Sequence, residues 1–281
     1  MPSVNVLFVV CHPDDEALWI GGLLHGMSRI SGITVHVVCL SGFDESSPRQ
    51  EEFEAAKAVA QYHAGVVMGS KLRPADQPLP PIAPTVIAGI TKLNLLMTDV
   101  DLLITHSPFG DEHMHPHHIQ ACEELYTWTI AQNISFGFFS CLPIANCYLE
   151  PTLKNMSRFK NLQPLNYARC RYGLFRSIIR RLEGKPWRYP SFYTQWLVDA
   201  EVKQRMLACY QSIDLSAHEQ GYAMFNNNVE SLYLFDHRGV ALLKHVLPLM
   251  EVPGSRDYFP GTWTNEGVKR RILNKIFFWR R

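Results

Sequence analysis

Residues 4–16 read VNVLFVVCHPDDE and carry the strongest indication of the fold. Its first eight residues are apolar apart from Asn5, rich in β-branched side chains, and end at a polar, proline-containing turn. This pattern predicts a parallel strand that is buried on both faces. Residues 17–28 then have helical character, so the chain is expected to begin as strand, turn and helix.

The same alternation continues toward the middle of the chain. After the proline-rich loop at residues 74–84, a helix is expected to run to roughly Leu96. The other strands are predicted at residues 33–40, 65–69, 100–105 and 135–142, and the other helices at residues 49–62 and 119–132. This order predicts an α/β fold, Rossmann-like, with a mostly parallel sheet and helices on both faces. A ligand site is expected beyond the carboxyl ends of the strands.

The character of the chain changes at residues 151–190. This segment holds ten Lys or Arg residues against the single acid Glu183, and we interpret it as a basic insertion. Residues 192–213 are predicted to form an amphipathic helix, with Trp196 and Tyr210 in the core, and residues 229–247 to hold further secondary structure. The whole chain, 1–281, is predicted to be one domain, in which residues 191–281 complete the structure.

Composition narrows the class of protein. A chain of 281 residues with 47% hydrophobic and 19% charged residues is typical of a globular protein with a sizeable core. A net charge of +1 gives no general attraction to nucleic acid, so no nucleic-acid partner is expected. The seven cysteines are widely spaced without a Cys-x-x-Cys pair, which indicates free thiols in a reducing compartment. The first apolar run is too short for a signal peptide or membrane span, so a cytoplasmic location is expected.

A first polar cluster, His12-Pro13-Asp14-Asp15-Glu16, follows the first predicted strand. Aspartates at this place can cap the helix by accepting backbone N–H bonds. Capping does not require a histidine, however, and His12 and Asp15 on one tight turn can converge on a metal ion. Asp14 would then point into the same space.

A second cluster, GDEHMHPHH, occupies residues 110–118 after the strand predicted at residues 100–105. Pro116 suits the first turn of the next helix, which would place His115 and His118 one turn apart at its N-terminus. A solvated, histidine-rich loop is the alternative. Two such clusters at strand ends favour a shared site over two unrelated loops.

These two blocks resemble those of the LmbE-like, PIG-L-type N-acetylglucosaminyl deacetylase family. The family carries Ala-His-Pro-Asp-Asp-Glu after its first strand and His-Pro-Asp-His further on. Residues 11–16, CHPDDE, match the first block in five of six positions, and residues 115–118, HPHH, match the second in three of four. The resemblance extends through Arg49-x-x-Glu52 and, loosely, through residues 203–212. It does not cover the basic insertion.

The resemblance implies one zinc ion per chain, held by His12, Asp15 and His118, although another divalent metal such as iron suits the same ligands. It further implies that Asp14 is the general base and His115 the group that polarises the carbonyl or donates a proton. The expected reaction is metal-dependent hydrolysis of the N-acetyl group of an N-acetylglucosamine-type conjugate, giving a free amino sugar and acetate.

Departures from the family pattern concern the surroundings of the ligands. His117 stands where the family often has Asp, so the carboxylate that would orient a neighbouring histidine is missing there. Glu16, Asp111 or Glu112 are the candidates to replace it. Cys11 replaces a small Ala, and we interpret it as a packing residue rather than a ligand.

Three further residues have weaker signals. Arg49 matches a family arginine and is predicted to bind substrate, with a solvated helical face at residues 49–54 as the equal alternative. His106 and His113 are predicted to be loop residues or neighbours of the ligands.

The expected partner is a small-molecule, lipid-linked or nucleotide-linked amino sugar. Basic residues mixed with aromatic ones at 151–190 and 268–281 are also compatible with contact at an anionic membrane. The alternatives to an enzyme are a non-catalytic metal- or sugar-binding module of the same fold, or a peripheral membrane protein acting through its basic segments. The presence of Asp14 favours the enzyme over the binding module, because a protein that only binds metal or sugar does not need this carboxylate.

Overall fold

The structure, a computed structural model, describes residues 3–42, 47–69, 77–107, 115–140, 192–197, 199–213 and 229–244. The basic insertion at 151–190 and the basic tail at 268–281 lie outside the described residues, as do Asp111, Glu112 and His113.

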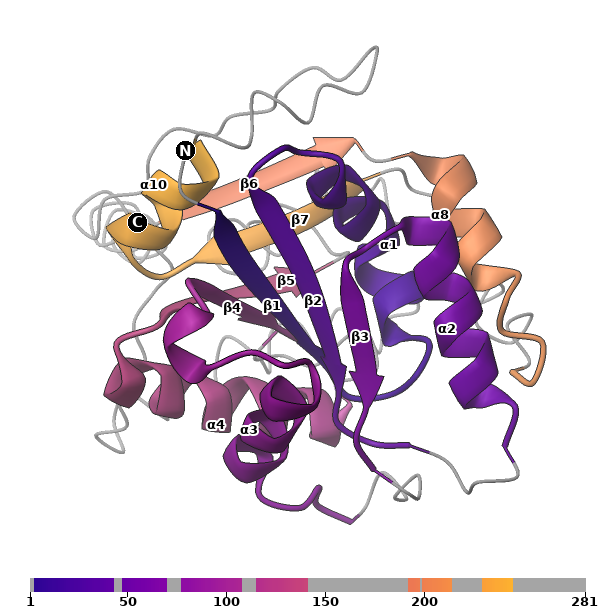
Figure 1. Ribbon diagram of the computed structural model, residues 1–281, viewed down its shortest axis with the longest axis horizontal. Coiled ribbons are helices and arrows are strands. Elements are labelled where there is room, and N and C mark those ends of the chain that lie inside the picture. Colours follow the sequence, from indigo (N-terminus) through magenta and orange to yellow (C-terminus); the bar gives the residue numbers. More distant parts are fainter. Residues whose placement is uncertain are drawn as a thin grey trace, which may run out of the picture.

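One sheet organises the described part of the chain (Figure 1). Its strand order is β3-β2-β1-β4-β5-β7-β6. The first five strands run parallel, whereas β7 is antiparallel to both β5 and β6. The strands are β1 (Val4–Val10), β2 (Ile33–Cys39), β3 (Ala64–Val67), β4 (Leu102–Thr105), β5 (Ser135–Ser140), β6 (Phe192–Leu197) and β7 (Val229–Leu234). The order β3-β2-β1-β4-β5 is that of a doubly wound nucleotide-binding sheet, which confirms the predicted α/β class.

Helices cover both faces of this sheet (Figure 1). One face carries α1, α2 and α8, and the other carries α3 and α4. The helices are α1 (Asp15–Ser28), α2 (Arg49–Ala60), α3 (Ile82–Lys92), the short 3₁₀ turn η1 (Met97–Asp99), α4 (Pro116–Gln132), α8 (Ala200–Leu207) and α10 (His237–Lys244). Predicted helix and strand positions up to residue 140 agree with these bounds to within a few residues.

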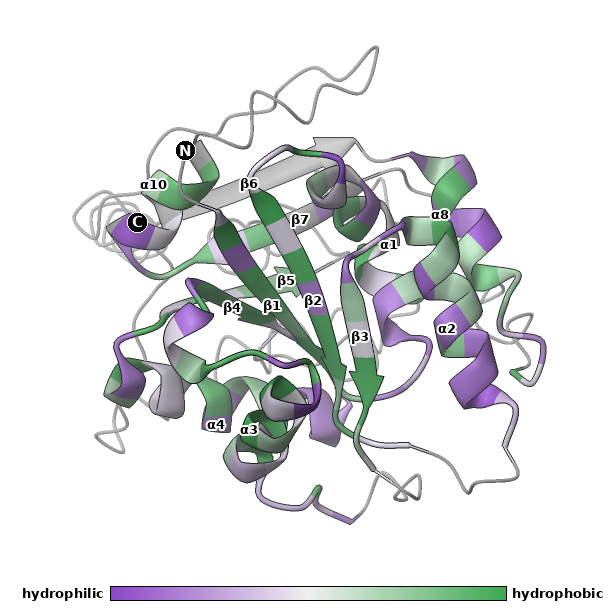
Figure 2. Cartoon of the chain, in the orientation of Figure 1, coloured by the Kyte–Doolittle hydropathy of each residue, from purple (hydrophilic) through white to green (hydrophobic). Residues whose placement is uncertain are grey.

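The burial of β1 explains why its sequence shows no alternation. Val6, Phe8 and Val10 enter the core beneath α1 and α2, while Leu7 and Val9 enter the core beneath α3 and α4. All five side chains are fully buried. Figure 2 shows the same distribution, with apolar colour along the central strands and polar colour on the outer side of α2. A strand buried on both faces in this way marks the centre of a parallel sheet.

The helix predicted across residues 192–213 is wrong in its first part. Residues 192–197 form β6, so Trp196 lies on a strand, and the helix starts only at Ala200. The Asp199 carboxylate caps α8 by accepting the backbone N–H groups of Glu201 (3.0 Å) and Val202 (3.2 Å). Tyr210 is buried as predicted, with 2% of its surface exposed. Residues 229–244 hold a strand and a helix, which confirms the secondary structure expected there.

The four cysteines in the described ranges, Cys11, Cys39, Cys122 and Cys209, are free thiols. None of the helices in the described ranges combines the length and the apolar character that a membrane crossing requires.

His36 on β2 is a buried histidine outside the polar clusters. Only 2% of its surface is exposed, and neither ring nitrogen has a hydrogen-bond partner within the described ranges. Burial, helped by the nearby His63, lowers the pKa of His36 to about 4, from an ordinary 6.5. The unfolded chain therefore binds a proton at His36 more readily than the folded chain does, and the free energy of unfolding falls as the pH drops from about 6.5 toward 4.

We expect His36→Val to remove this acid sensitivity. In urea unfolding, the variant should lose about 1–2 kcal/mol less stability than the wild type between pH 7 and pH 4.5. The exposed neighbour provides a control, because His63→Gln leaves His36 buried and should retain most of the wild-type pH dependence. A His36→Val protein with an unchanged pH profile would show that this imidazole is not the titrating group.

Candidate functional site

The described residues of both polar clusters lie at the carboxyl edge of the sheet, where β1 and β4 are neighbours. The first cluster follows β1, and the described part of the second, residues 115–118, begins α4, which follows β4 in the chain. The sequence order of the strands reverses between β1 and β4, because the chain places β2 and β3 on one side of β1 and then crosses over through α3 to place β4 and β5 on the other. Such a switch point leaves a crevice outside the strand ends, which is the usual ligand site of a doubly wound sheet.

The turn after β1 has strained backbone at Asp14. This residue has φ 135° and ψ −28°, a conformation that L-residues other than glycine rarely adopt. Its carboxylate makes no capping hydrogen bond to α1, so the capping role is not seen at Asp14. Strain of this kind is retained where the surrounding structure fixes a functional side chain.

Asp15 faces backward into the turn instead of capping the helix. Its Oδ2 accepts the backbone N–H groups of Cys11 (3.2 Å) and His12 (2.8 Å), and its Oδ1 accepts the indole N–H of Trp19 (3.1 Å). Burial alone would raise the pKa of Asp15, but the imidazoles of His118, His106 and His12 hold it well below its ordinary value. The carboxylate is therefore ionised and fixed in place.

Three side chains from the two clusters meet at nearly equal spacing. His12 Nδ1 and His118 Nε2 each lie 3.3 Å from Asp15 Oδ2, and these two nitrogens are 3.3 Å apart. Tetrahedral ligands at zinc–ligand distances of 2.0–2.1 Å would be separated by about 3.3 Å. Two nitrogens and one carboxylate oxygen, all buried, therefore fit a divalent ion such as zinc and leave a fourth position open.

His115 lies beside this group of three as the N-cap residue of α4. Pro116 occupies the first turn, and the ring of His115 lies with its centroid 4.7 Å from those of both His12 and His118. A ring nitrogen of His115 is within 4.8 Å of one on each of these histidines, so His12, His115 and His118 are a second set able to hold a metal. His115 is only half-buried, unlike the other two.

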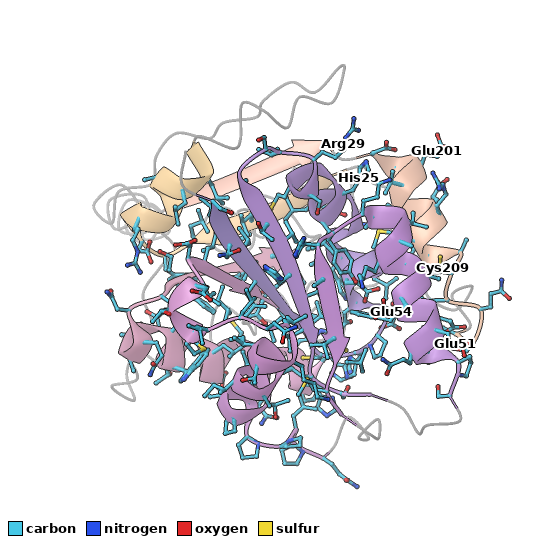
Figure 3. All side chains as sticks on the ribbon, viewed as in Figure 1. His25, Arg29, Glu51, Glu54, Glu201 and Cys209 are labelled. Atoms are coloured by element: carbon cyan, nitrogen blue, oxygen red, sulfur yellow. The ribbon has the colours of Figure 1, made fainter. Side chains whose placement is uncertain are left out.

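Asp14 and Arg49 face each other next to the candidate ligand Asp15. Arg49 Nη1 is 3.8 Å from Asp14 Oδ2, and both side chains are more than four-fifths buried. Burial and the neighbouring Asp15 raise the pKa of Asp14 well above its ordinary value, against the opposing effect of Arg49. The alternative of a solvated face at residues 49–54 holds for Glu51 and Glu54, which are exposed (Figure 3), but not for Arg49.

Two buried carboxylates contact the segment after α8, Glu16 from the start of α1 and Glu52 from α2. The Tyr210 hydroxyl donates to Glu16, whose Oε2 accepts the backbone N–H of Asp14 at 3.1 Å. Glu52 accepts the backbone N–H (2.8 Å) and hydroxyl (2.6 Å) of Ser212. Burial raises the pKa of Glu16 to about 7. Glu16 therefore supports the backbone of Asp14, and among the described histidines of the second cluster it orients none of His115, His117 and His118.

His106 lies against two of the candidate ligands, Asp15 and His118, which agrees with the prediction that it neighbours them. Its ring stacks on that of His118 with the centroids 3.8 Å apart, and its Nε2 lies 3.0 Å from the backbone nitrogen of Cys11 and 3.3 Å from Asp15 Oδ2. Burial and the neighbouring His118 lower the pKa of His106 to about 4. Cys11, His106 and His118 form another possible ligand set, so a metal role of the Cys11 thiol stays an alternative.

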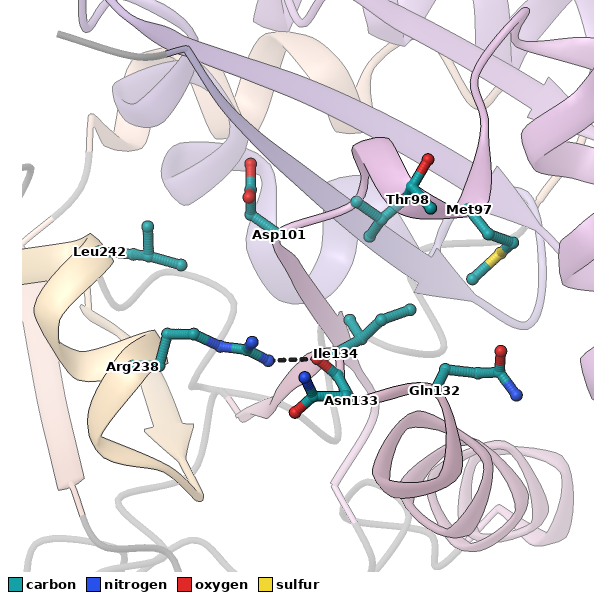
Figure 4. Close-up of a pocket in the computed structure, with 9 residues that line it drawn as sticks. Met97, Thr98, Asp101, Gln132, Asn133, Ile134, Arg238 and Leu242 are labelled. Carbon is teal, nitrogen blue, oxygen red and sulfur yellow. Dashed lines mark hydrogen bonds between the residues drawn. The ribbon is translucent and has the colours of Figure 1, made fainter.

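A cavity of about 250 Å³ at the opposite edge of the sheet contains none of these residues (Figure 4). It lies at the amino ends of β4 and β5, and its walls include Asp101, Asn133 and Arg238. The guanidinium of Arg238 already donates to the Asn133 carbonyl and to Ser135 Oγ, the latter at 3.0 Å. The described histidines and carboxylates that converge lie at the carboxyl edge instead.

The fold and this cluster define a doubly wound α/β protein with histidines and carboxylates gathered at the switch point. Residues 7–129 match the family model described as GlcNAc-PI de-N-acetylase, PIG-L. The resemblance expected from the two sequence blocks is confirmed over these residues, which include every candidate ligand.

Solved structures of deacetylases are similar to this chain at low identity. The zinc-inhibited form of teicoplanin deacetylase Orf2 shares 13% identity over 82% of this chain and 97% of its own, with a TM-score of 0.49. The A40926 pseudoaglycone deacetylase Dbv21 shares 15% over 82% and 96%, with a TM-score of 0.46. N,N'-diacetylchitobiose deacetylase from Pyrococcus horikoshii shares 18% over 78% and 70%, with a TM-score of 0.36. No curated protein matches the chain at a significant level.

Proposed function

We propose that this protein is a metal-dependent N-deacetylase that hydrolyses the N-acetyl group of an N-acetylglucosamine-type conjugate. The observation that carries the proposal is the equal 3.3 Å spacing of His12 Nδ1, Asp15 Oδ2 and His118 Nε2. These three residues would hold one zinc ion per chain. The PIG-L match and the deacetylase names of the similar structures support the reaction class.

A divalent ion held there would lower the pKa of a water molecule and polarise the amide carbonyl of the substrate. Asp14 takes a proton from the attacking water, and its environment suits this role because burial raises its pKa from that of an ordinary aspartate. His115, when protonated, stabilises the developing oxyanion and then gives its proton to the departing amine. The amide carbon–nitrogen bond breaks, and the products are acetate and a free amino group on the sugar.

Arg49 is proposed to contact the substrate from its position beside Asp14. A guanidinium suits sugar hydroxyls or a phosphate on the conjugate. Three expectations stay predictions. They are that the substrate is lipid-linked or nucleotide-linked, that the basic segments at 151–190 and 268–281 contribute to binding, and that residues 1–281 form one domain. Acetate release from such conjugates that is unchanged after deletion of 151–190 would contradict a substrate role for the insertion.

The test combines metal analysis with acetate release from a panel of N-acetylglucosamine conjugates. We expect about one zinc per chain, loss of activity on chelation, and recovery when zinc is returned, because a site with three protein ligands and one open position is of the catalytic type. His118→Gln should retain little metal. The exposed His63 provides the matched control, since His63→Gln should retain full metal content. A metal-loaded protein that is inactive on every conjugate would favour the binding module over the enzyme.

A further inference from the structure

His117 has a defined place in the site, although it stands where the family often has Asp. Its side chain is buried, with 1% of its surface exposed. Its Nδ1 lies 3.0 Å from His12 Nε2, and its Nε2 lies 2.8 Å from the backbone carbonyl oxygen of Gln77. A short chain of hydrogen bonds therefore runs from the loop before α3, through the start of α4, to the turn after β1.

The direction of this chain follows from the chemistry of its end. A carbonyl oxygen only accepts, so the Nε2 of His117 carries a hydrogen and donates it to Gln77. In a neutral ring the Nδ1 of His117 is then the acceptor, and His12 must donate through its Nε2. The lone pair of His12 is thereby left on Nδ1, which is the atom 3.3 Å from both Asp15 Oδ2 and His118 Nε2.

The opposite tautomer of His12 would conflict with this arrangement. With its hydrogen on Nδ1, His12 would point that hydrogen at Asp15, and Nδ1 would have no lone pair with which to bind a metal ion. Its Nε2 would then face the Nδ1 of His117 at 3.0 Å with a lone pair on each atom. The environment of His117 therefore selects the tautomer of His12 that can bind metal.

We propose that His117 is a positioning residue, which fixes the tautomer and ring orientation of His12 in place of a carboxylate. This inference rests on the proposed function in that it concerns the same metal site. Hydrogen-bond partners of ligating histidines typically contribute 10- to 100-fold in metal affinity. His117 is not a ligand in this proposal and does not contact the reacting atoms.

Two measurements on the protein without substrate test it. Long-range ¹H–¹⁵N correlation spectra of the metal-free protein, labelled at histidine, report which ring nitrogen of His12 bears the hydrogen. We expect an unprotonated Nδ1 in the wild type and a loss of this preference in His117→Leu. Zinc affinity, measured by competition with a chelator, should fall 10- to 100-fold in His117→Leu.

His117→Asn provides the conservative variant, because its amide oxygen can accept the hydrogen of His12 Nε2 from about the place of Nδ1. It should retain the wild-type tautomer and lie within about fivefold of the wild-type zinc affinity, which a purely steric role of His117 would not predict. Should His117→Leu fail to fold, the wild-type spectrum and the Asn variant still decide the matter.

A wild-type His12 that is protonated at Nδ1 would overturn the proposal, as would a folded His117→Leu that binds zinc as tightly as the wild type. Failure of the proposed function gives a different pattern. In that case the protein releases no acetate from any conjugate, while the tautomer of His12 and its response to His117 are unchanged.

Discussion

Asp14→Asn should abolish acetate release while leaving the metal in place. Asparagine has nearly the same shape, but its amide cannot take a proton from water at neutral pH, so we expect kcat to fall by about 10²- to 10⁴-fold. Asp14 is not among the three residues at 3.3 Å spacing, and the proposed ligands Asp15 and His118 are untouched by the change. The measurements are zinc content and kcat on the best conjugate of the panel.

The pairing of Asp14 with Arg49 makes a control necessary. The two side chains lie 3.8 Å apart, so the substitution also removes a negative charge beside the guanidinium. Arg49→Lys keeps that positive charge and should act mainly on KM if Arg49 binds substrate. An Asp14→Asn protein with full zinc and near wild-type kcat would remove the general base from the mechanism and favour a non-catalytic role for this carboxylate.

The sequence predicted the centre of this site because its signals are local. Strands buried on both faces leave continuous apolar runs, and the polar residues that end them fall at one edge of a parallel sheet. This logic brought His12 and His118 together although 106 positions separate them. The same logic applies to His106, which directly follows β4 and was predicted to be a loop residue or a neighbour of the candidate ligands.

Contacts that depend on distant backbone gave no signal at all. The bond from His117 to Gln77 joins a side chain to a carbonyl 40 positions away, and no residue type at position 77 is required for it. The strand β6 was missed for a different reason. Its apolar residues are spaced like those of the following helix, and the aromatic residues Phe192, Tyr193 and Trp196 were the overlooked signs of a strand.

Loss of either partner of the buried ion pair between Lys203 and Glu230 should destabilise the fold by about 3–5 kcal/mol. Lys203 Nζ on α8 lies 3.0 Å from Glu230 Oε1 on β7, with both side chains almost fully buried. The carboxylate also accepts the backbone N–H groups of Gly22 (3.2 Å) and Leu23 (2.6 Å) inside α1. Glu230 therefore joins three elements, so Lys203→Met leaves a buried charge without its ammonium and Glu230→Gln leaves the ammonium unpaired.

Urea unfolding measures the loss of stability, and we expect the m-value to be the same as in the wild type. The melting temperature of each single variant should fall by about 10 °C. Glu54→Gln is the matched control, because the Glu54–Lys57 pair on α2 is exposed and should contribute less than about 1 kcal/mol. The double variant Lys203→Met with Glu230→Gln should regain part of the loss, since no unpaired charge is left buried. Equal effects at the buried and exposed pairs would contradict this account.

The Lys203–Glu230 pair is expected to affect the stability of the fold without affecting the proposed catalysis. Helix α1 starts at the proposed ligand Asp15, and the segment after α8 places the Tyr210 hydroxyl on Glu16, which supports the backbone of Asp14. Because Lys203 and Glu230 act on the far part of α1 and not on these bonds, we expect kcat per folded molecule at 20 °C to stay within about threefold of the wild type. A large fall in kcat at full zinc content would instead show that α8 docking sets the geometry of Asp14, and that fold stability and catalysis are coupled through Tyr210.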